Sequence, residues 1–261
     1  MAQVRAVTSR DNALLLRVRK LVADPGGYRR AGEVWIDGEH LCAAFLQHGG
    51  APPQAIVTEA AWQLPALRAL AQAAANVAIV PQALMAGLSP LDSAPPLGFV
   101  VPWAAHEALL ADAPSVVLDR LQDAGNVGTI VRSAAAFGFT QVIALKGTAA
   151  LWSHKVLRAG MGAHFGLHLV EGLDSDALAA LRVPLLATSS HAARALHEAA
   201  LPWPCAWVMG HEGQGVSAAL VARCAVSLRI AQPGGEESLN VAAAAAVCLY
   251  ESARQRTTNT R

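Results

Sequence analysis

Cysteine is scarce in this chain, and its four cysteines form no recognisable motif. Cys42, Cys205, Cys224 and Cys248 are scattered along 261 residues, with no CxxC spacing. A zinc ribbon needs closely spaced cysteine pairs, and a small disulfide-stabilised domain needs a regular set of cysteines. This pattern argues against both classes. The sequence also shows no membrane segment and no signal peptide, so we expect a soluble, cytoplasmic protein.

Charged residues are also few, at 15%, whereas hydrophobic residues reach 54%. This balance favours a large folded core over general disorder, and the length fits about two domains. Long apolar runs are missing, because the uncharged stretch Val241–Tyr250 is well short of the roughly 20 residues of a membrane-spanning helix. The first ten residues contain two arginines and no apolar run. We therefore expect neither a membrane segment nor a signal peptide.

The net charge of +1 conceals a basic N-terminal end. Residues 1–30 contain seven basic and two acidic side chains, whereas Arg68 is the only basic residue between Ala31 and Ser115. Such an end suits contact with a polyanion, since lysine and arginine near phosphates release condensed counterions. A solvated helix face explains the same charges, so charge alone does not identify a partner.

Apolar periodicity predicts two α/β domains, at 1–106 and 107–261. In the first, a helix over 11–23, capped by Asp11 or Asn12, precedes strands at 33–36, 55–58, 77–80 and 99–103. Residues 107–114 form the expected linker. In the second, strands are predicted at 115–118, 141–145, 185–188, 207–209 and 226–230. Helical stretches between most of these indicate a largely parallel sheet covered on both faces, with ligands at the carboxyl ends of its strands.

The first of three informative segments follows the strand that ends at Leu118. The chain turns at Gly125, and Asn126 is placed to cap a helix over 127–137 that Gly138 closes. Arg132 lies off the apolar stripe of this helix, where it can face a ligand. An ordinary cap and a surface arginine explain these two residues equally well.

The second and third segments also follow strand ends. The loop after Met209 contains Gly210, Glu212, Gly213 and Gly215, but it has neither GxGxxG nor GxxxxGK[ST] spacing, and a tight turn would explain it. The third runs from Ile230 through Pro-Gly-Gly into a helix beginning near Ser238. Ser238 or Asn240 is a possible cap for this helix, and its five consecutive alanines permit close packing against another element, including a second subunit.

Together and in this order, the segments resemble the three motifs of the SpoU–TrmH branch of the SPOUT methyltransferases. The matching patterns are Asn126-x-Gly128 with Arg132, Gly210-x-Glu212-x-x-Gly215 and Glu237-Ser-Leu-Asn240, with support from Lys155-Val-Leu-Arg158-Ala-Gly-Met-Gly162. The resemblance covers about 115–251. More loosely, Ser9–Asn12 and Ile36–His40 resemble the family's small substrate-binding domain, which is similar to ribosomal protein L30.

The resemblance implies a homodimer with a deep trefoil knot, which transfers methyl from S-adenosylmethionine to a ribose 2′-hydroxyl in RNA. It also implies the site residues. The catalytic group is Asn126, Arg132, Glu212, Ser238 and Asn240; the cofactor group is Thr188, Gly210, Ile230, Gln232 and Leu239; the RNA contacts are Arg10, Asn12, Arg17 and Arg158. The chain departs from the family at His211 and at Ala231-Gln232.

The roles expected of these residues follow from the chemistry of a weak nucleophile. The site must position the ribose hydroxyl and remove its proton. Arg132 is a poor base because a guanidinium stays protonated, so we expect it to clamp an RNA phosphate and stabilise developing negative charge, with the base left open. Asn126 would orient Arg132 or the ribose, and Glu212 would fix an arginine or a backbone amide. Ser238 and Asn240 would order the cofactor loop and the catalytic pocket.

Other functions are weighed against this one. His164 and His168 lie four apart in an apparent strand, without an HExxH motif, so no metal site is expected. A nicotinamide-dependent oxidoreductase lacks its glycine fingerprint, and an inactive RNA-binding or assembly protein would be expected to have lost Asn126, Arg132 or Glu212. Ribosomal RNA is the preferred substrate, and transfer RNA is the alternative.

Overall fold

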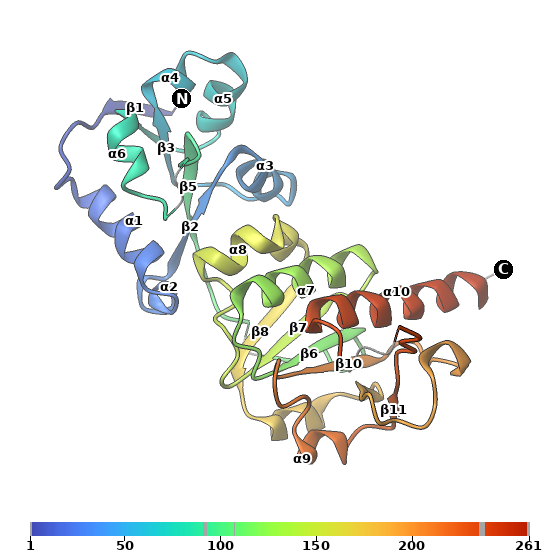
Figure 1. Cartoon of the computed structure of the whole chain (residues 1–261). Coiled ribbons are helices and arrows are strands. Elements are labelled where there is room, and N and C mark those ends of the chain that lie inside the picture. The colour runs from blue at the N-terminus through green and yellow to red at the C-terminus, as the bar shows by residue number, and fades with distance from the viewer. Residues whose placement is uncertain (1, 91–92, 107, 235–237, 260–261) are drawn as a thin grey trace. The chain divides into compact units, whose positions relative to one another are not determined.

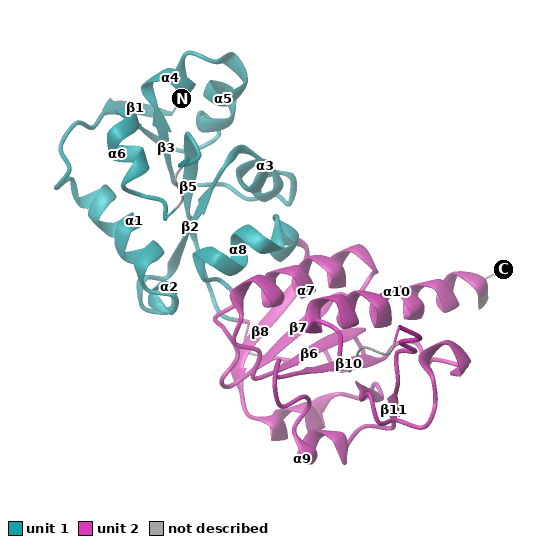
Figure 2. Cartoon of the chain, in the orientation of Figure 1, with its two compact units in different colours: residues 1–105, 152–165 teal, residues 106–151, 166–261 magenta. Residues whose placement is uncertain are grey.

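The computed structural model describes residues 2–90, 93–106, 108–234 and 238–259. The chain divides into two compact units, drawn in teal and magenta in Figure 2. The first contains residues 1–105 and 152–165, and the second contains residues 106–151 and 166–261. The two domains expected from the sequence, residues 1–106 and 107–261, stay a prediction. In the described part of the chain, no helix is both long and apolar enough to span a membrane.

The first unit is built on a mixed sheet whose strand order is β1-β4-β3-β5-β2. Its strands are β1 (Gln3–Ala6), β2 (Glu33–Asp37), β3 (Gln54–Thr58), β4 (Asn76–Val80) and β5 (Leu97–Pro102). Strand β4 is parallel to β1 and β3, whereas β5 is antiparallel to β3 and β2. The sequence predicted all of these strands except β1, whose residues are all exposed and therefore show no apolar pattern.

The helices of the first unit begin with the predicted one. Helix α1 (Ala13–Ala23) buries Leu14, Leu15, Val18 and Leu21, and Asn12 caps it by accepting a hydrogen bond from the Leu14 amide at 3.0 Å. The others are α2 (Gly27–Ala31), α3 (Glu39–Gln47), α4 (Glu59–Trp62), α5 (Pro65–Ala71), α6 (Gln82–Ala86) and α8 (His154–Gly160). Although α8 comes late in the chain, it packs on β2. There the buried Asp37 Oδ1 lies 3.0 Å from His154 Nε2 and accepts from Arg158 Nη1 at 3.1 Å.

The second unit contains a fully parallel sheet of order β11-β9-β10-β6-β7-β8. Its strands are β6 (Ser115–Asp119), β7 (Gln141–Leu145), β8 (His168–Leu173), β9 (Leu185–Thr188), β10 (Ala206–Gly210) and β11 (Val226–Leu228). The prediction that His164 and His168 share one strand was wrong. His164 lies in the 3-10 turn η1 (Ala163–Gly166), because the chain bends before β8 begins at His168.

Both faces of this sheet are covered, which confirms the predicted layering. Helices α7 (Ala124–Ala136) and α10 (Val241–Asn259) lie side by side (Figure 1), and Trp207 Nε1 of β10 donates to Ser252 Oγ of α10 at 2.9 Å. On the opposite face, Val117 and Val208 pack in one cluster with Leu178 and Leu220. The last two residues belong to η2 (Ser175–Ala180) and α9 (Ala218–Val221); a further turn, η3 (Leu196–Glu198), precedes β10.

Candidate active site

Four strands of the second unit end at one edge of its sheet. Asp119, the last residue of β6, pairs with Gly210 of β10, and Thr188 of β9 pairs with Leu228 of β11. The neighbours of β6 are β7 on one side and β10 on the other, so the chain reverses its direction across the sheet there. Open parallel sheets bind ligands at such an edge, near the reversal. All three predicted segments leave the sheet at this edge.

Asn126 does not cap helix α7. The helix begins at Ala124, and the side chain of Asp123 accepts from the Asn126 amide nitrogen at 2.7 Å. The predicted cap was therefore wrong, because Asp123, three residues earlier, supplies the acceptor. As a result, the carboxamide of Asn126 is available for contacts with other loops.

A chain of hydrogen bonds joins the three segments through Asn126. Asn126 Nδ2 donates to Glu212 Oε1 at 3.4 Å, and Asn126 Oδ1 accepts from Asn240 Nδ2 at 3.0 Å. Asn240 in turn caps α10, since its Oδ1 accepts from the amides of Ala242 and Ala243 at 2.9 and 3.2 Å. Because both ends of the Asn126 amide are engaged, its orientation is fixed.

Glu212 acts here as an acceptor of hydrogen bonds. Its two carboxylate oxygens also accept from the backbone amides of Gln122 and Asp123, at 3.3 and 3.1 Å. Burial by itself would raise the pKa of the Glu212 carboxyl, but these backbone donors and Asn126 outweigh it and lower that pKa. Of the two partners expected for Glu212, an arginine or a backbone amide, the structure shows the backbone amide. A carboxylate held in this way is a weak base.

Residues from both predicted groups line one pocket at the same edge. It has a volume of about 140 Å³, and its lining residues are Thr188, Ser189, Ser190, Ile230, Gln232, Ser238, Leu239 and Ala244. Two aliphatic side chains, Ile230 and Leu239, therefore lie in the same cavity as several hydroxyl groups and a carboxamide. This mixture suits a nucleoside, which has an apolar base and a polar sugar. Glu237 of the third motif lies outside the described residues.

Position 210 requires a glycine because the loop that follows it folds back against this residue. A Cβ atom built on Gly210 would lie 2.1 Å from both the Gly215 carbonyl carbon and the Val216 nitrogen. The loop is closed by paired hydrogen bonds between the backbones of His211 and Gly215, and His211 Nδ1 accepts from the Gly213 amide at 3.0 Å. Gly210 therefore has a structural role, and its predicted part in binding the cofactor stays a prediction.

Arg132 is exposed on α7, six residues after Asn126. Within the described parts of the chain, its guanidinium makes no hydrogen bond or ion pair. An arginine that is not already neutralised by a carboxylate can bind a phosphate or a developing oxyanion.

The predicted RNA contacts lie in the first unit, where each has a structural partner. Asn12 is occupied as the cap of α1, and the backbone carbonyl of Arg10 accepts from Arg19 Nη1 at 2.8 Å. Arg17 pairs with Glu33 at 3.0 Å, and Arg158 donates to Asp37. Arg10 and Arg17 are exposed, and one third of the Arg158 side chain is accessible (33%). Their role in binding RNA stays a prediction.

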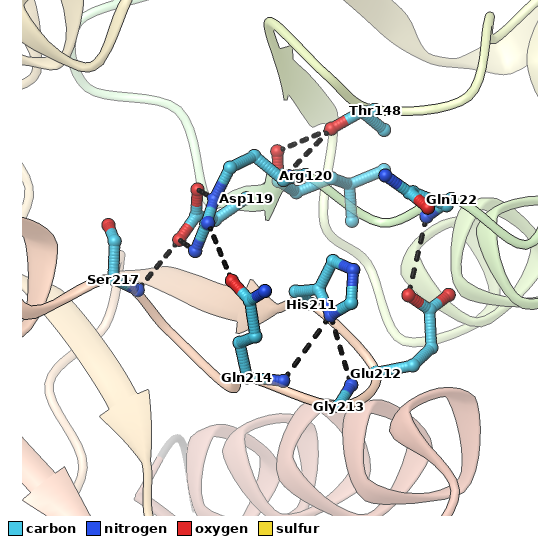
Figure 3. Close-up of polar contacts among 10 residues, drawn as sticks. Asp119, Arg120, Gln122, Thr148, His211, Glu212, Gly213, Gln214 and Ser217 are labelled. Carbon is cyan, nitrogen blue, oxygen red and sulfur yellow. Dashed lines mark hydrogen bonds and ion pairs between the residues drawn. The ribbon is translucent and has the colours of Figure 1, made fainter.

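The sequence interpretation missed a cluster beside the Glu212 loop, shown in Figure 3. Asp119 is the last residue of β6 and Arg120 follows it directly. The two residues contact Ser217 and Gln214, respectively, in the loop after β10. The available signal was a charged pair placed directly at a strand end, where ligand sites form in parallel sheets. No motif of the resemblance drew attention to it.

No metal centre is found among the residues that the structure describes: nowhere do three or more His, Cys, Asp or Glu side chains gather with the geometry to hold an ion.

Comparison with known proteins identifies the family of this chain. Residues 113–250 match the model of the SpoU rRNA methylase family. A Synechocystis protein named as an uncharacterized tRNA/rRNA methyltransferase is 30% identical over 98% of this chain and 96% of its own length. A 23S rRNA (uridine(2479)-2′-O)-methyltransferase of Streptomyces viridochromogenes is 27% identical over 97% of this chain and 93% of its own. The solved structure of the SpoU methyltransferase AviRb from that organism, in complex with AdoMet, has a TM-score of 0.82 at 25% identity and covers 95% of this chain and 100% of that one.

The second unit is thus a parallel-sheet domain in which the three segments that carry the motifs converge at one edge. The matched segment runs from β6 into the first half of α10 and includes all three motifs. The chain belongs to the SpoU rRNA methylase family.

Proposed function

We propose that the protein transfers a methyl group from S-adenosylmethionine to a ribose 2′-hydroxyl of ribosomal RNA. The observation that carries this proposal is the hydrogen-bonded chain Glu212–Asn126–Asn240, which unites the three family motifs. It is supported by the neighbouring nucleoside-compatible pocket and by the full-length relatives.

The residues present fit the cofactor. Ile230 and Leu239 would contact the adenine, and Thr188, Gln232 and Ser238 would bind the polar parts. The pocket is smaller than the roughly 300–1,000 Å³ typical of a drug-sized ligand, so it would hold one end of the cofactor. When bound, S-adenosylmethionine supplies a methyl group on a positively charged sulfur, which is already a good electrophile.

The side chains around this pocket would prepare the ribose hydroxyl. Arg132 would bind an RNA phosphate next to the reacting ribose and stabilise negative charge as the hydroxyl loses its proton. The fixed carboxamide of Asn126 would orient the ribose, since Glu212 and Asn240 hold it at both ends. Neither Arg132 nor Glu212 is suited to take the proton, because a guanidinium stays charged and the Glu212 pKa is lowered.

Transfer of labelled methyl to separate pools of ribosomal and transfer RNA tests this function. We expect label in ribosomal RNA, recovered as a 2′-O-methylnucleoside after digestion. Label in transfer RNA alone would support the alternative substrate. If no label enters naked RNA while S-adenosylmethionine binds, the same assay on ribosomal precursor particles distinguishes an assembly-stage substrate from an inactive RNA-binding protein.

The first unit would bind the RNA substrate through the basic face of α1 and α2. A cavity of about 450 Å³ lies there, and its lining residues are Arg17, Lys20, Leu21, Ala23, Asp24, Gly27, Arg30 and Ala31. Arg17 and Arg30 are paired with Glu33 and Asp24, whereas Lys20 is exposed and makes no ion pair within the described residues. An apolar floor with a cationic rim suits a nucleotide of single-stranded RNA.

Replacing Lys20 by glutamate is expected to weaken RNA binding and to raise the KM for RNA about tenfold, because it reverses one charge at this rim. The dissociation constant of S-adenosylmethionine should not change. Fluorescence anisotropy with labelled RNA measures the first quantity and calorimetry the second. Glu39→Lys on α3, an exposed charge reversal of the opposite sign outside the cavity lining, is the control; an unchanged RNA affinity in the Lys20 variant would contradict this role.

We also propose a homodimer, formed through α10. Val247 and Tyr250 on this helix are 41% and 54% exposed, and together with the neighbouring alanines they offer an apolar surface that a second chain could cover. Light scattering of the purified protein tests it directly, since a dimer has twice the 27.1 kDa mass of one chain.

A further inference from the structure

Arg120 has a backbone conformation that is uncommon for its residue type. Its φ is +60°, and Met161 is the only other non-glycine residue with positive φ in the described part of the chain. Such conformations persist where several contacts hold them, and they concentrate at functional sites. Arg120 immediately follows the last residue of β6, at the edge where the ligand loops meet.

Contacts on both the backbone and the side chain hold Arg120 in place. Its amide donates to Thr148 Oγ1 at 3.1 Å, and Thr148 Oγ1 donates to the Leu118 carbonyl at 3.0 Å. Its guanidinium donates to Asp119 Oδ1 at 2.9 Å through Nε and to Gln214 Oε1 at 3.1 Å through Nη1. Figure 3 shows the guanidinium lying between these two acceptors. One arginine therefore links the end of β6 to the loop after β10.

That loop carries Glu212, and its C-terminal end is held by the carboxylate of Asp119. Asp119 is 97% buried, and its Oδ2 accepts from the Ser217 amide at 2.8 Å. Gln214 lies between Glu212 and Ser217, so the Arg120 bond supports the middle of the loop. Glu212 then holds Asn126, as described above. In metal sites, removing a side chain that orients a metal ligand through a hydrogen bond commonly lowers activity about 10–100-fold. We expect an effect of similar size when the side chain orients a catalytic residue.

We propose that Arg120 is a positioning residue for methyl transfer: by bridging Asp119 and Gln214 it sets the position of Glu212 and therefore the orientation of Asn126. This inference rests on the proposed function. Arg120 contacts neither of the residues predicted to bind ribose or phosphate, so its effect must pass through the loop. The expected signature is a lower kcat with little change in the KM for RNA.

Two single variants and their combination test the bridge. Arg120→Gly suits the positive φ but removes the guanidinium. Gln214→Leu removes the carboxamide, and with it the acceptor for Arg120, from an exposed position. We expect Arg120→Gly to lower kcat about 10–100-fold and Gln214→Leu to lower it about tenfold, with KM for RNA within about twofold. The double variant should be no slower than Arg120→Gly alone, because both changes break one interaction. Gln214→Glu, which keeps an acceptor for Arg120, should retain activity.

Arg182→Gly is the matched control, since Arg182 also donates to a carboxylate, that of Asp112, but on the exposed surface away from these loops. Full kcat in Arg120→Gly and Gln214→Leu would overturn the proposal, as would losses that multiply in the double variant. Losses matched by a falling fraction of folded protein, measured by circular dichroism, would overturn it in favour of a purely structural role. If the unmodified protein methylates neither RNA nor ribosomal particles, the proposed function itself fails, and this inference fails with it.

Discussion

Arg132→Ala is expected to lower kcat for methyl transfer about 10²–10³-fold while the fold and the binding of S-adenosylmethionine are retained. The magnitude is that of removing one group that stabilises an oxyanion in the transition state. Arg132 is exposed and makes no ion pair within the described residues, so its loss leaves no buried charge unpaired. It is also absent from the lining of the proposed cofactor pocket. Single-turnover transfer of labelled methyl measures the rate, and calorimetry measures cofactor affinity.

Two further variants give this experiment its controls. Arg132→Lys keeps the charge but loses the planar fork that binds a phosphate at two points, so it should recover only part of the rate. Arg182→Ala removes another exposed arginine of the same unit and should leave the rate unchanged. Full activity in Arg132→Ala would contradict the proposed role of Arg132 in methyl transfer.

Gly210→Ala is expected to reduce cofactor affinity at least about tenfold and to destabilise the protein by about 1–3 kcal/mol, the usual cost of forcing an atom into packed structure. The added methyl group would lie 2.1 Å from two backbone atoms of residues 215 and 216, which belong to the loop itself and cannot rotate away like a side chain. The loop must therefore move, and with it Glu212. Calorimetry with S-adenosylmethionine and thermal unfolding followed by circular dichroism measure the two effects.

Gly213→Ala in the same loop is a matched control. A Cβ atom on Gly213 would meet only the His211 ring, at the ordinary distance of 3.9 Å. We expect affinity and unfolding temperature close to those of the unmodified protein. Equal effects in the two variants would mean that a methyl group is harmful anywhere in this loop. The clash of residue 210 with residues 215 and 216 would then not be the cause.

Much of the fold could be predicted because its central strands are buried on both faces. Strands β7 and β9 have the predicted bounds, since each is a short apolar run with clear ends. Strand β1 could not be found, because a fully exposed edge strand has no apolar signal. The place of α8 was equally hidden: where it packs on β2, Arg158 pairs with the buried Asp37, and these two residues are more than a hundred positions apart.

The candidate site was predicted in its members but not in its contacts. Spacing and resemblance singled out Asn126, Glu212 and Asn240, and the structure joins them in one hydrogen-bonded chain. The cap of α7 was predicted wrongly as Asn126, because Asp123 and Asn126 are both good capping residues and sequence alone does not rank them. The bridge through Arg120 was missed for a different reason: it depends on the backbone conformation of a single residue, which no side-chain pattern reports.

The late arrival of α8 in the chain has a consequence for synthesis on the ribosome. The first unit lacks α8 until residue 165 has been added, about sixty residues after its last strand is complete. At roughly 5–20 residues per second, that is a wait of about 3–12 s. During this time Asp37 has neither His154 nor Arg158 beside it. The nascent first unit therefore waits for a piece that is encoded after β6, α7 and β7, so the two units cannot finish folding strictly one after the other.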